Sequence, residues 1–330
     1  MPSKEETIAR LAKIPTLTIS EGALLSRYTR FGIGGPAEIY AHTAGEHAFV
    51  AALETVSAAG MNLAVIGGGT NLIVSDSGFP GIVLRFTADS IEHNATCVRV
   101  AAGAELQALV DYSTGRGLRG LETMTGIPGS VGAAIYGNAG AYGHSISEVA
   151  QTVRFFDGSE IRCISNADCE FQYRESVFKR HKNWIIFSAE LRLETAPAAE
   201  LRQTADDILK IRNQKYPPAM KCAGSIFKNL ILKELREPVR KVVPEKVIRE
   251  GKVPSAWFLE QVGAKGMQNG GIQVADYHAN LIYNAGQGTA QQLCEVIAEL
   301  KSRVLRQFGL ELEEEVQYVG FDRNGPGPAV

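Results

Sequence analysis

The sequence is poor in cysteine, in net charge and in long apolar runs, and each shortage excludes a class of protein. The five cysteines, an odd number without a CxxC pair, indicate neither a disulfide framework nor a zinc site. Lysine and arginine total 34 against 36 aspartates and glutamates, so the net charge of -2 gives no sign of a nucleic-acid partner. We expect the cysteines at positions 97, 163, 169, 222 and 294 to be reduced and mostly buried.

Other absences narrow the class further. The first twenty residues carry charges throughout and lack the apolar core of a signal peptide, and no later run is apolar enough to span a bilayer. None of the six histidines has the spacing of metal ligands, so no metal site is expected. We expect a cytoplasmic monomer without membrane insertion, acting on small molecules.

What is present fits a globular protein with two domains. The chain has 330 residues, of which 45% are hydrophobic. The patterns predict helices over 44–60, ended by Gly60, from residue 104, over 200–216 before a proline pair, and from a Thr289 cap to Gly309. Strands are expected at 63–66, 72–74, 81–86, 97–103, 152–158, 161–164 and 184–194. A domain boundary is expected near residue 200.

Two glycine-rich segments stand out. GIPGSVGAAIYGNAGAYG at 126–143 contains no charged side chain, and GGGTN at 67–71 lies between two apolar runs. Glycine lets backbone amides approach a ligand closely, as in loops that hold phosphate. Either segment alone could equally be a tight structural turn. Together, with the amides of Asn71 and Asn138 beside them, they favour a flavin dinucleotide.

A Rossmann nucleotide site does not fit these segments. That fingerprint follows a strand and opens a helix. GIGG at 32–35 lacks the spacing, and GGGTN runs into a strand-like stretch. We therefore expect the ligand to be held by loops.

Several motifs, taken together, resemble the UDP-N-acetylenolpyruvoylglucosamine reductase family. They run almost from end to end of the chain: FGIGGPAEIY at 31–40, GGGTNLIVSD at 67–76, the run at 126–143, YRESVF at 173–178, AGSIFKN at 223–229, HANLIYN at 278–284 and FGLELEEEVQYVG at 308–320. The resemblance implies an α+β fold. It comprises a two-subdomain FAD-binding fold of the vanillyl-alcohol-oxidase type and a smaller C-terminal α/β substrate domain. We place an N-terminal segment at 1–22, the FAD-binding domain at 23–200 and the substrate domain at 201–330.

The family reaction reduces the enolpyruvyl group of UDP-N-acetylglucosamine enolpyruvate to UDP-N-acetylmuramate for peptidoglycan. Hydride goes to the terminal vinyl carbon and a proton to the carbon that bears the carboxylate, so the intermediate resembles an enolate. Such a site needs groups that stabilise negative charge and a positioned acid. By resemblance, Arg174 and Glu315 stabilise the intermediate and Ser225 protonates it.

The resemblance also implies non-covalent FAD, with NADPH as the hydride donor. Substrate contacts are expected from Tyr173, Lys228 and Asn229. FAD contacts are expected from Gly67, Gly68, Gly69, Thr70, Asn71, Leu72, Gly126, Ile127, Pro128, Gly129, Ser130, Gly132, Asn138, Ala139, Gly140 and Tyr142.

Each catalytic candidate has a plainer interpretation. Arg174 could pair with Glu175 at the surface, and Ser225 could cap a turn. Glu315 belongs to an acidic cluster, most of which is expected to be solvated. His278 is more readily a hydrogen-bonded structural residue than a base.

Departures from the family pattern and two alternative functions remain. Leu230 replaces a usual proline, Ala133 replaces a common glycine, and the segment 231–254 looks long. A tyrosine-bearing loop of one family branch is absent, which suggests the shorter branch. A flavin oxidase, with His144 as a covalent flavin attachment, and a nucleotide-binding protein without catalysis are the alternatives. Retention of all three catalytic candidates argues against the second.

Overall fold

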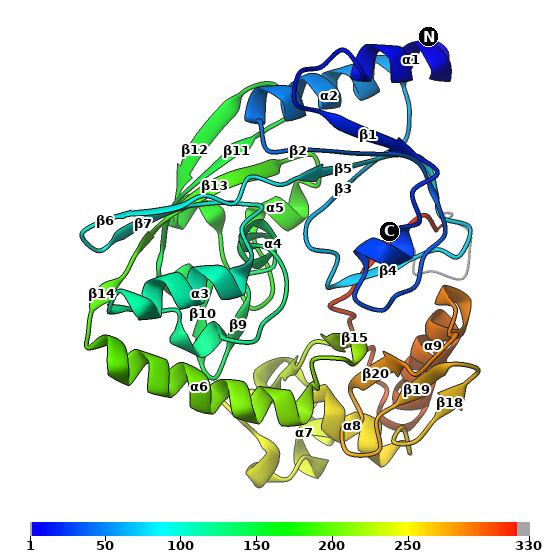
Figure 1. The fold of residues 1–330 in the computed structure, drawn as a ribbon. Helices are drawn as coiled ribbons and strands as arrows, with labels where there is room; N and C mark the ends of the chain where they lie inside the picture. Colours follow the sequence, from blue (N-terminus) through cyan, green and yellow to red (C-terminus); the bar gives the residue numbers. More distant parts are fainter. Residues whose placement is uncertain (1, 322–330) are drawn as a thin grey trace. The chain divides into compact units, whose positions relative to one another are not determined.

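The chain forms two compact units that are interleaved in sequence. The computed structural model describes residues 2–321, shown in Figure 1. Unit 1 contains the chain up to Ala23, then Ala37–Gly69 and Pro80–Gln214. Unit 2 contains Leu24–Pro36, Thr70–Phe79 and the chain from Lys215 onward. A single cut near residue 200 does not express this interleaving, and the division into cofactor and substrate domains stays a prediction.

Unit 1 begins with a mixed four-stranded sheet. Its strand order is β1-β2-β5-β3, with β1 antiparallel to β2 and β3 parallel to β5. The bounds are β1 Thr18–Glu21, β2 Ala37–Thr43, β3 Leu63–Ile66 and β5 Phe79–Phe86. Helices α1 (Lys4–Leu11) and α2 (Glu46–Ala59) pack against one another, and α2 also packs on β2.

A second, antiparallel sheet forms the rest of unit 1, in the order β12-β11-β13-β7-β6. Its strands are β6 Ile91–Asn94, β7 Cys97–Ala101, β11 Ala150–Phe156, β12 Ile161–Ser165 and β13 Ile185–Arg192. Two short pairs join β8 (Leu118–Arg119) to β14 (Glu194–Thr195) and β9 (Gly140–Ala141) to β10 (His144–Ser145). The helices are α3 Leu106–Gly115, α4 Val131–Tyr136, α5 Val177–Arg180 and α6 Ala198–Lys215.

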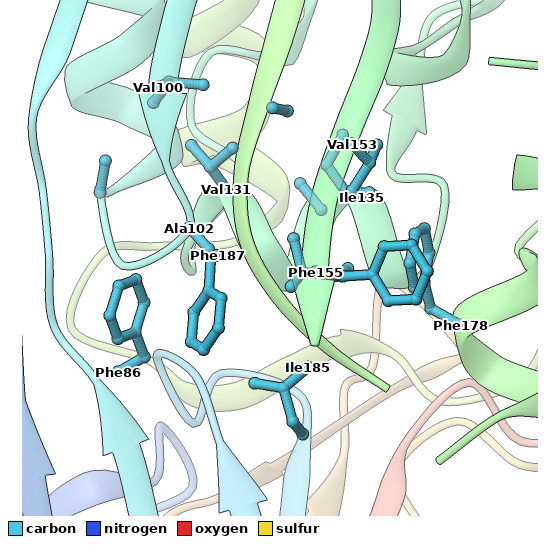
Figure 2. Packing of buried hydrophobic residues seen from close by; sticks show 14 of the residues in the cluster. Phe86, Val100, Ala102, Val131, Ile135, Val153, Phe155, Phe178, Ile185 and Phe187 are labelled. Atoms are coloured by element: carbon cyan, nitrogen blue, oxygen red, sulfur yellow. The ribbon is translucent and has the colours of Figure 1, made fainter. Parts of the chain in front are cut away.

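The core of unit 1 spans both sheets, and α4 packs on the second of them. Helix α4 contacts β7 and β13, and its Val131 and Ile135 are buried. Figure 2 shows Phe86 beside Phe187, whose ring centroids are 4.9 Å apart. Burying one such phenylalanine stabilises the fold by roughly 1.5–3 kcal/mol. The glycine-rich segment that contains α4 is therefore anchored by a packed core.

Unit 2 is built on a small antiparallel sheet, in the order β15-β20-β19-β18. Its strands are β15 Lys221–Ser225, β18 Gln268–Asn269, β19 Ile272–Val274 and β20 Leu281–Asn284. Two further pairs are β16 (Leu230–Ile231) with β17 (Lys252–Val253), and β4 (Leu72–Val74) with β21 (Gln317–Val319). The helices are α7 Glu237–Val242, α8 Ser255–Gln261 and α9 Ala290–Phe308.

The expected helix ends are confirmed where the local chemistry is strong. Gly60 and Gly309 both adopt left-handed backbone and end α2 and α9. The Thr289 hydroxyl accepts a hydrogen bond from the amide of Gln292, as an N-cap does. Helix α6 ends at Lys215, just before the proline pair.

The segment 126–143, which we expected to hold the ligand as a loop, is partly helical. Residues Val131–Tyr136 form the helix α4, and the Ser130 hydroxyl caps it by accepting from the amide of Ala133. The apolar residues of VGAAIY supply enough buried surface to hold one and a half turns against the sheet.

Candidate active site

The two glycine loops lie against each other within unit 1. A Cβ added at Gly67 would lie 2.7 Å from the Ser130 hydroxyl oxygen, and one at Gly68 would lie 3.1 Å from the Cα of Gly129. Gly129 itself has a φ of +117°, a backbone conformation that residues with a side chain rarely adopt. The close approach of the two loops therefore depends on glycine, and their role in holding the cofactor's phosphates stays a prediction.

The start of α4 is pinned to the end of β7. The amides of Val131 and Gly132 donate to the carbonyls of Ala104 and Ala102 at 2.8 Å each. A Cβ on Gly132 would approach the Cβ of Ala102 to 2.9 Å. This glycine therefore serves helix–strand packing, which is one reason why the run is so rich in glycine.

The second half of the glycine run turns back on itself. Tyr142 and Gly143 both have positive φ, at 54° and 84°, and they connect β9 to β10. Asn138 is buried with a φ of +42°, and its side-chain amide donates to the carbonyl of Gln172 at 2.8 Å. His144, the attachment expected of an oxidase, contacts Glu148 through Nδ1 at 2.8 Å.

Arg174 is held beside the glycine run. It occupies a tight turn in which Gln172 and Glu175 exchange backbone hydrogen bonds, and its φ is +57°. One guanidinium nitrogen donates to the carbonyl of Gly140 at 2.9 Å, and Lys179 donates to the Arg174 carbonyl at 2.9 Å. The structure thus brings this predicted catalytic cation next to the predicted flavin segment, within unit 1.

Tyr173 precedes Arg174 in the same turn. The Arg174 guanidinium carbon lies 5.2 Å from the centroid of the Tyr173 ring, within range of a cation–π interaction. The Tyr173 ring is therefore held next to the Arg174 guanidinium in this turn.

In unit 2, an irregularity in the sheet presents Ser225. Strand β15 pairs with β20 at Cys222 and again at Ser225, with a register shift between them. Gly224 takes a φ of +77° within this bulge. Bulges of this kind redirect a side chain and often lie beside active sites. The Ser225 hydroxyl lies 3.2 Å from the hydroxyl of Tyr216.

The residues after Ser225 are fixed by a buried amide. Asn280 accepts from the amide of Phe227 at 2.9 Å and donates to the Phe227 carbonyl at 2.9 Å and to the Ser255 hydroxyl at 2.7 Å. Its own carbonyl accepts from the amide of Ile226 at 3.1 Å. Asn280 is only 2% exposed, so this network is shielded from water and holds the segment rigidly.

Lys228 and Asn229, the predicted substrate contacts, follow directly. Lys228 is 8% exposed, and its ammonium contacts Glu313 at 2.5 Å. The side-chain carbonyl of Asn229 accepts from the amide of Ser255 at 3.4 Å. Both side chains are therefore tied to elements of unit 2.

Glu315 and Ser225 are brought together in unit 2. The amide of Glu315 donates to the carbonyl of Ile226 at 2.7 Å, one residue from Ser225. The backbone of Glu315 is also held by Asn71, whose side-chain amide donates to the Glu315 carbonyl at 2.8 Å. The expectation that most of the acidic cluster is solvated is only partly right, because the Glu314 side chain is 12% exposed and pairs with Lys301 at 2.8 Å.

His278 makes a structural hydrogen bond, as expected. Its Nδ1 accepts a hydrogen bond from the amide of Asn280 at 3.2 Å. Burial lowers the pKa of His278 to about 4, so the ring is neutral near pH 7. With Nδ1 engaged by a backbone amide and its basicity lowered by burial, the ring is suited to a structural role.

The rest of the described chain adds no metal or membrane feature. Residues 2–321 contain no cluster of three or more histidine, cysteine or acidic side chains able to hold a metal. In the same range, every helix is too short or too polar to cross a bilayer. All five cysteines are free, and Cys169, Cys222 and Cys294 are buried.

Comparisons with known proteins agree with this arrangement. Residues 216–319 match the family model of the UDP-N-acetylenolpyruvoylglucosamine reductase C-terminal domain, and residues 37–160 match that of an FAD binding domain. The chain is 64% identical to the UDP-N-acetylenolpyruvoylglucosamine reductase of Solibacter usitatus, over 94% of this chain and all of that protein. The chain belongs to this reductase family.

Further relatives agree with the assignment. The family protein of Bacillus licheniformis is 30% identical over 97% of this chain and its own full length. The crystal structure of the reductase from Thermus caldophilus matches with a TM-score of 0.72 at 26% identity, covering 92% of this chain and 99% of that one. The expected α+β fold, with an FAD-binding domain ahead of a smaller C-terminal domain, is confirmed, and the chain is an FAD-dependent oxidoreductase.

The structure also brings forward residues that the motifs did not single out. Asn280 lies inside HANLIYN, and its burial does not follow from the motif. Asp76 ends GGGTNLIVSD and accepts from the amides of Ala290 and Gln291 at the start of α9, at 2.9 and 3.1 Å. Tyr216 is, in the sequence, only the last residue of the predicted helix before the proline pair.

Proposed function

We propose that the chain reduces the enolpyruvyl group of UDP-N-acetylglucosamine enolpyruvate to UDP-N-acetylmuramate, a precursor of peptidoglycan. NADPH is the hydride source and FAD is bound without a covalent link. Support comes from 64% identity along the whole of a family member and from the family motifs at 173–178, 223–229 and 308–320. We further propose that it acts as a monomer in the cytoplasm, where nucleotide substrates are made.

The observation that carries the proposal is the pairing of two chain segments in unit 2. Phe227 forms a β-bridge with Glu314, and the Glu315 amide donates to the Ile226 carbonyl at 2.7 Å. Two residues far apart in sequence, Ser225 and Glu315, thereby occupy neighbouring segments. A proton donor and a carboxylate on neighbouring segments suit a reaction that protonates a carbon and must orient a polarised substrate.

When bound, reduced FAD would supply hydride to the terminal vinyl carbon; the remaining roles belong to residues of this chain. Ser225 holds the proton that goes to the carbon bearing the carboxylate. Arg174 presents a fixed positive charge to the negative charge that develops on that carboxylate. The glycine loops at 67–69 and 126–132 would hold the cofactor's phosphates, while Lys228 and Asn229 contact the sugar nucleotide.

The reaction is tested by following the flavin without oxygen. The purified protein is reduced with NADPH under anaerobic conditions, and the enolpyruvyl sugar nucleotide is then added. Return of the oxidised flavin absorbance within seconds supports the proposal. A flavin that bleaches with NADPH but is reoxidised only by oxygen would identify an oxidase and overturn it.

Replacing Ser225 with alanine separates the two half-reactions. Reduction of the flavin by NADPH should change less than about twofold, because no proton is delivered to carbon in that step. Reoxidation by the enolpyruvyl substrate should slow by about 10²–10⁴-fold, the usual contribution of a positioned acid. Stopped-flow absorbance measures both rates, and Ser57→Ala on the exposed face of α2 is the control. Equal loss in both half-reactions would exclude the assigned role.

A further inference from the structure

Tyr216 lies in position to act on Ser225. Its hydroxyl oxygen is 3.2 Å from the Ser225 hydroxyl oxygen. Its ring packs on the small buried cluster of Cys222, Ala275 and Leu281. The residue therefore reaches the bulge from the chain segment that enters unit 2, nine positions earlier in the sequence.

The Tyr216 side chain is restrained from several directions. It precedes Pro217, which restricts its backbone to extended conformations. The ammonium of Lys215 lies 5.0 Å from the centroid of its ring, and the centroid of the His278 ring lies 6.4 Å away. A restrained phenol can keep one hydrogen-bond direction through many turnovers, at little entropic cost.

The chemistry of the two hydroxyls decides which one donates. A phenol is a much stronger acid than an aliphatic alcohol and is the better hydrogen-bond donor. If Tyr216 donates to Ser225, the single hydrogen of Ser225 stays available for the substrate. If Ser225 donated instead, the hydrogen needed for the reaction would be used on the tyrosine.

We propose that Tyr216 is the positioning residue that orients the Ser225 hydroxyl and restores its proton after each turnover. This inference rests on the proposed function. The O–H bond of Ser225 breaks as the substrate C–H bond forms, and the serine oxygen then takes the proton of Tyr216. Solvent returns a proton to the phenol oxygen, so the net proton comes from water and no electrons are transferred in the relay.

The surroundings of Tyr216 suit a transient negative charge on its oxygen. Lys215 contributes a cation close to the ring, and a nearby cation stabilises a phenolate by Coulombic attraction. Other titratable side chains also lie near Tyr216. They are Cys222, Tyr277, His278 and Tyr283.

The variant Tyr216→Phe removes the hydroxyl and keeps the ring. Reduction of the flavin by NADPH should stay within about twofold of the unaltered enzyme. Reoxidation by the enolpyruvyl sugar nucleotide should slow by at least about 10-fold, less than the roughly 10²–10⁴-fold of a direct acid because Ser225 itself remains. The ratio of the reoxidation rates in H₂O and D₂O should also change, because the proton reaches the substrate by another route.

Tyr283→Phe is the matched control. Its hydroxyl donates to Gln273 at 2.7 Å on the same sheet, so the variant loses one tyrosine hydroxyl without touching Ser225. Both half-reactions of this variant should be close to those of the unaltered enzyme. The pH dependence of reoxidation should be altered in Tyr216→Phe alone.

The double variant decides between a relay and a structural role. Once Ser225 is alanine, adding Tyr216→Phe should have no further effect on reoxidation, because the tyrosine acts through the serine. An additive loss, or equal slowing of both half-reactions in Tyr216→Phe, would overturn the inference. If the unaltered enzyme itself is not reoxidised by this substrate, the proposed function fails; unaltered reoxidation in Tyr216→Phe refutes only the relay.

Discussion

At the scale of single residues, glycines allow backbone segments to approach closely, and side-chain amides of asparagine hold those segments in place by hydrogen bonds. Asn71 was expected to serve the flavin, yet its side-chain amide donates to the Glu315 carbonyl. Its own carbonyl accepts from the amide of Gln317 at 2.9 Å. One asparagine thus fixes the backbone on both sides of Val316. Its role toward FAD stays a prediction.

Gly68 gives a test of the glycine loops. In Gly68→Ala the new Cβ would lie 3.1 Å from the Cα of Gly129 and 3.3 Å from the amide nitrogen of Ser130, so backbone must move. We expect FAD affinity to fall by at least about 10-fold, or about 1.4 kcal/mol. Quenching of flavin fluorescence on binding measures the affinity.

The control for this variant is Gly286→Ala. A Cβ at Gly286 meets nothing within 4 Å, so FAD affinity should be unchanged. Equal affinities for the two alanine variants would show that the contact of the loops does not support the cofactor.

At the scale of elements, one bulge and one helix start define the geometry of unit 2. The bulge in β15 sets the direction of Ser225, and its position follows from the pairing with β20. The start of α9 receives two independent caps, the Thr289 hydroxyl and the Asp76 carboxylate. A carboxylate at a helix N-terminus is stabilising because it satisfies free amides and opposes the helix dipole.

Removing that carboxylate should loosen unit 2. In Asp76→Ala the amides of Ala290 and Gln291 lose their acceptor, and the free energy of unfolding should fall by about 1–2 kcal/mol. Asp76→Asn keeps one acceptor and should lose clearly less. Urea unfolding compares the three proteins, and hydrogen exchange should show faster exchange in β4 of the alanine variant. Identical stabilities for the alanine variant and the parent would refute the capping role.

At the scale of the whole molecule, the chain passes between the two units several times. Segment Thr70–Phe79 joins unit 2 because β4 pairs in parallel with β21 and because Asp76 caps α9. The boundary falls inside GGGTN, between Gly69 and Thr70. A motif that reads as one loop in sequence therefore serves two packing units.

Stability should depend on pH through His278. Its pKa is lowered to about 4 in the folded chain by burial, against 6.5 when unfolded. Between these values the unfolded chain binds the proton preferentially, so the free energy of unfolding falls as pH drops from about 6.5 to 4. The loss should reach about 2–3 kcal/mol at the lower end. Urea unfolding at a series of pH values measures it.

The variant His278→Asn isolates this effect. Asparagine can still accept from the amide two residues on, but it does not titrate. The slope between pH 6.5 and 4 should therefore flatten relative to the parent. Hydrogen bonds from Glu160 and Ser159 lower the pKa of Asp157 to about 2, and its contribution is lost only below pH 4, in a separate window. A slope unchanged by the substitution would mean that His278 is not the group responsible.

The sequence by itself determined the elements with strong local chemistry and the family to which the chain belongs. Helices α2 and α9 end at Gly60 and Gly309 because glycine readily adopts left-handed backbone. Helix α6 ends before Pro217 because proline cannot continue a helix. Both effects are local in the sequence. Family motifs carried the FAD-binding assignment because they are linear in sequence. Helix α4 was missed because the glycines of the surrounding run masked a short apolar face that is stable only when packed.

The tertiary structure alone decided which distant residues meet. The pairing of segment 226–227 with 314–315, the Asn71 bond to Glu315 and the Tyr216 contact with Ser225 join positions from 9 to 244 residues apart. No local pattern encodes such contacts, since they arise only when burial of apolar surface folds the chain and aligns its strands. For that reason the proton donor could be named from a motif, whereas the groups that hold it required the fold.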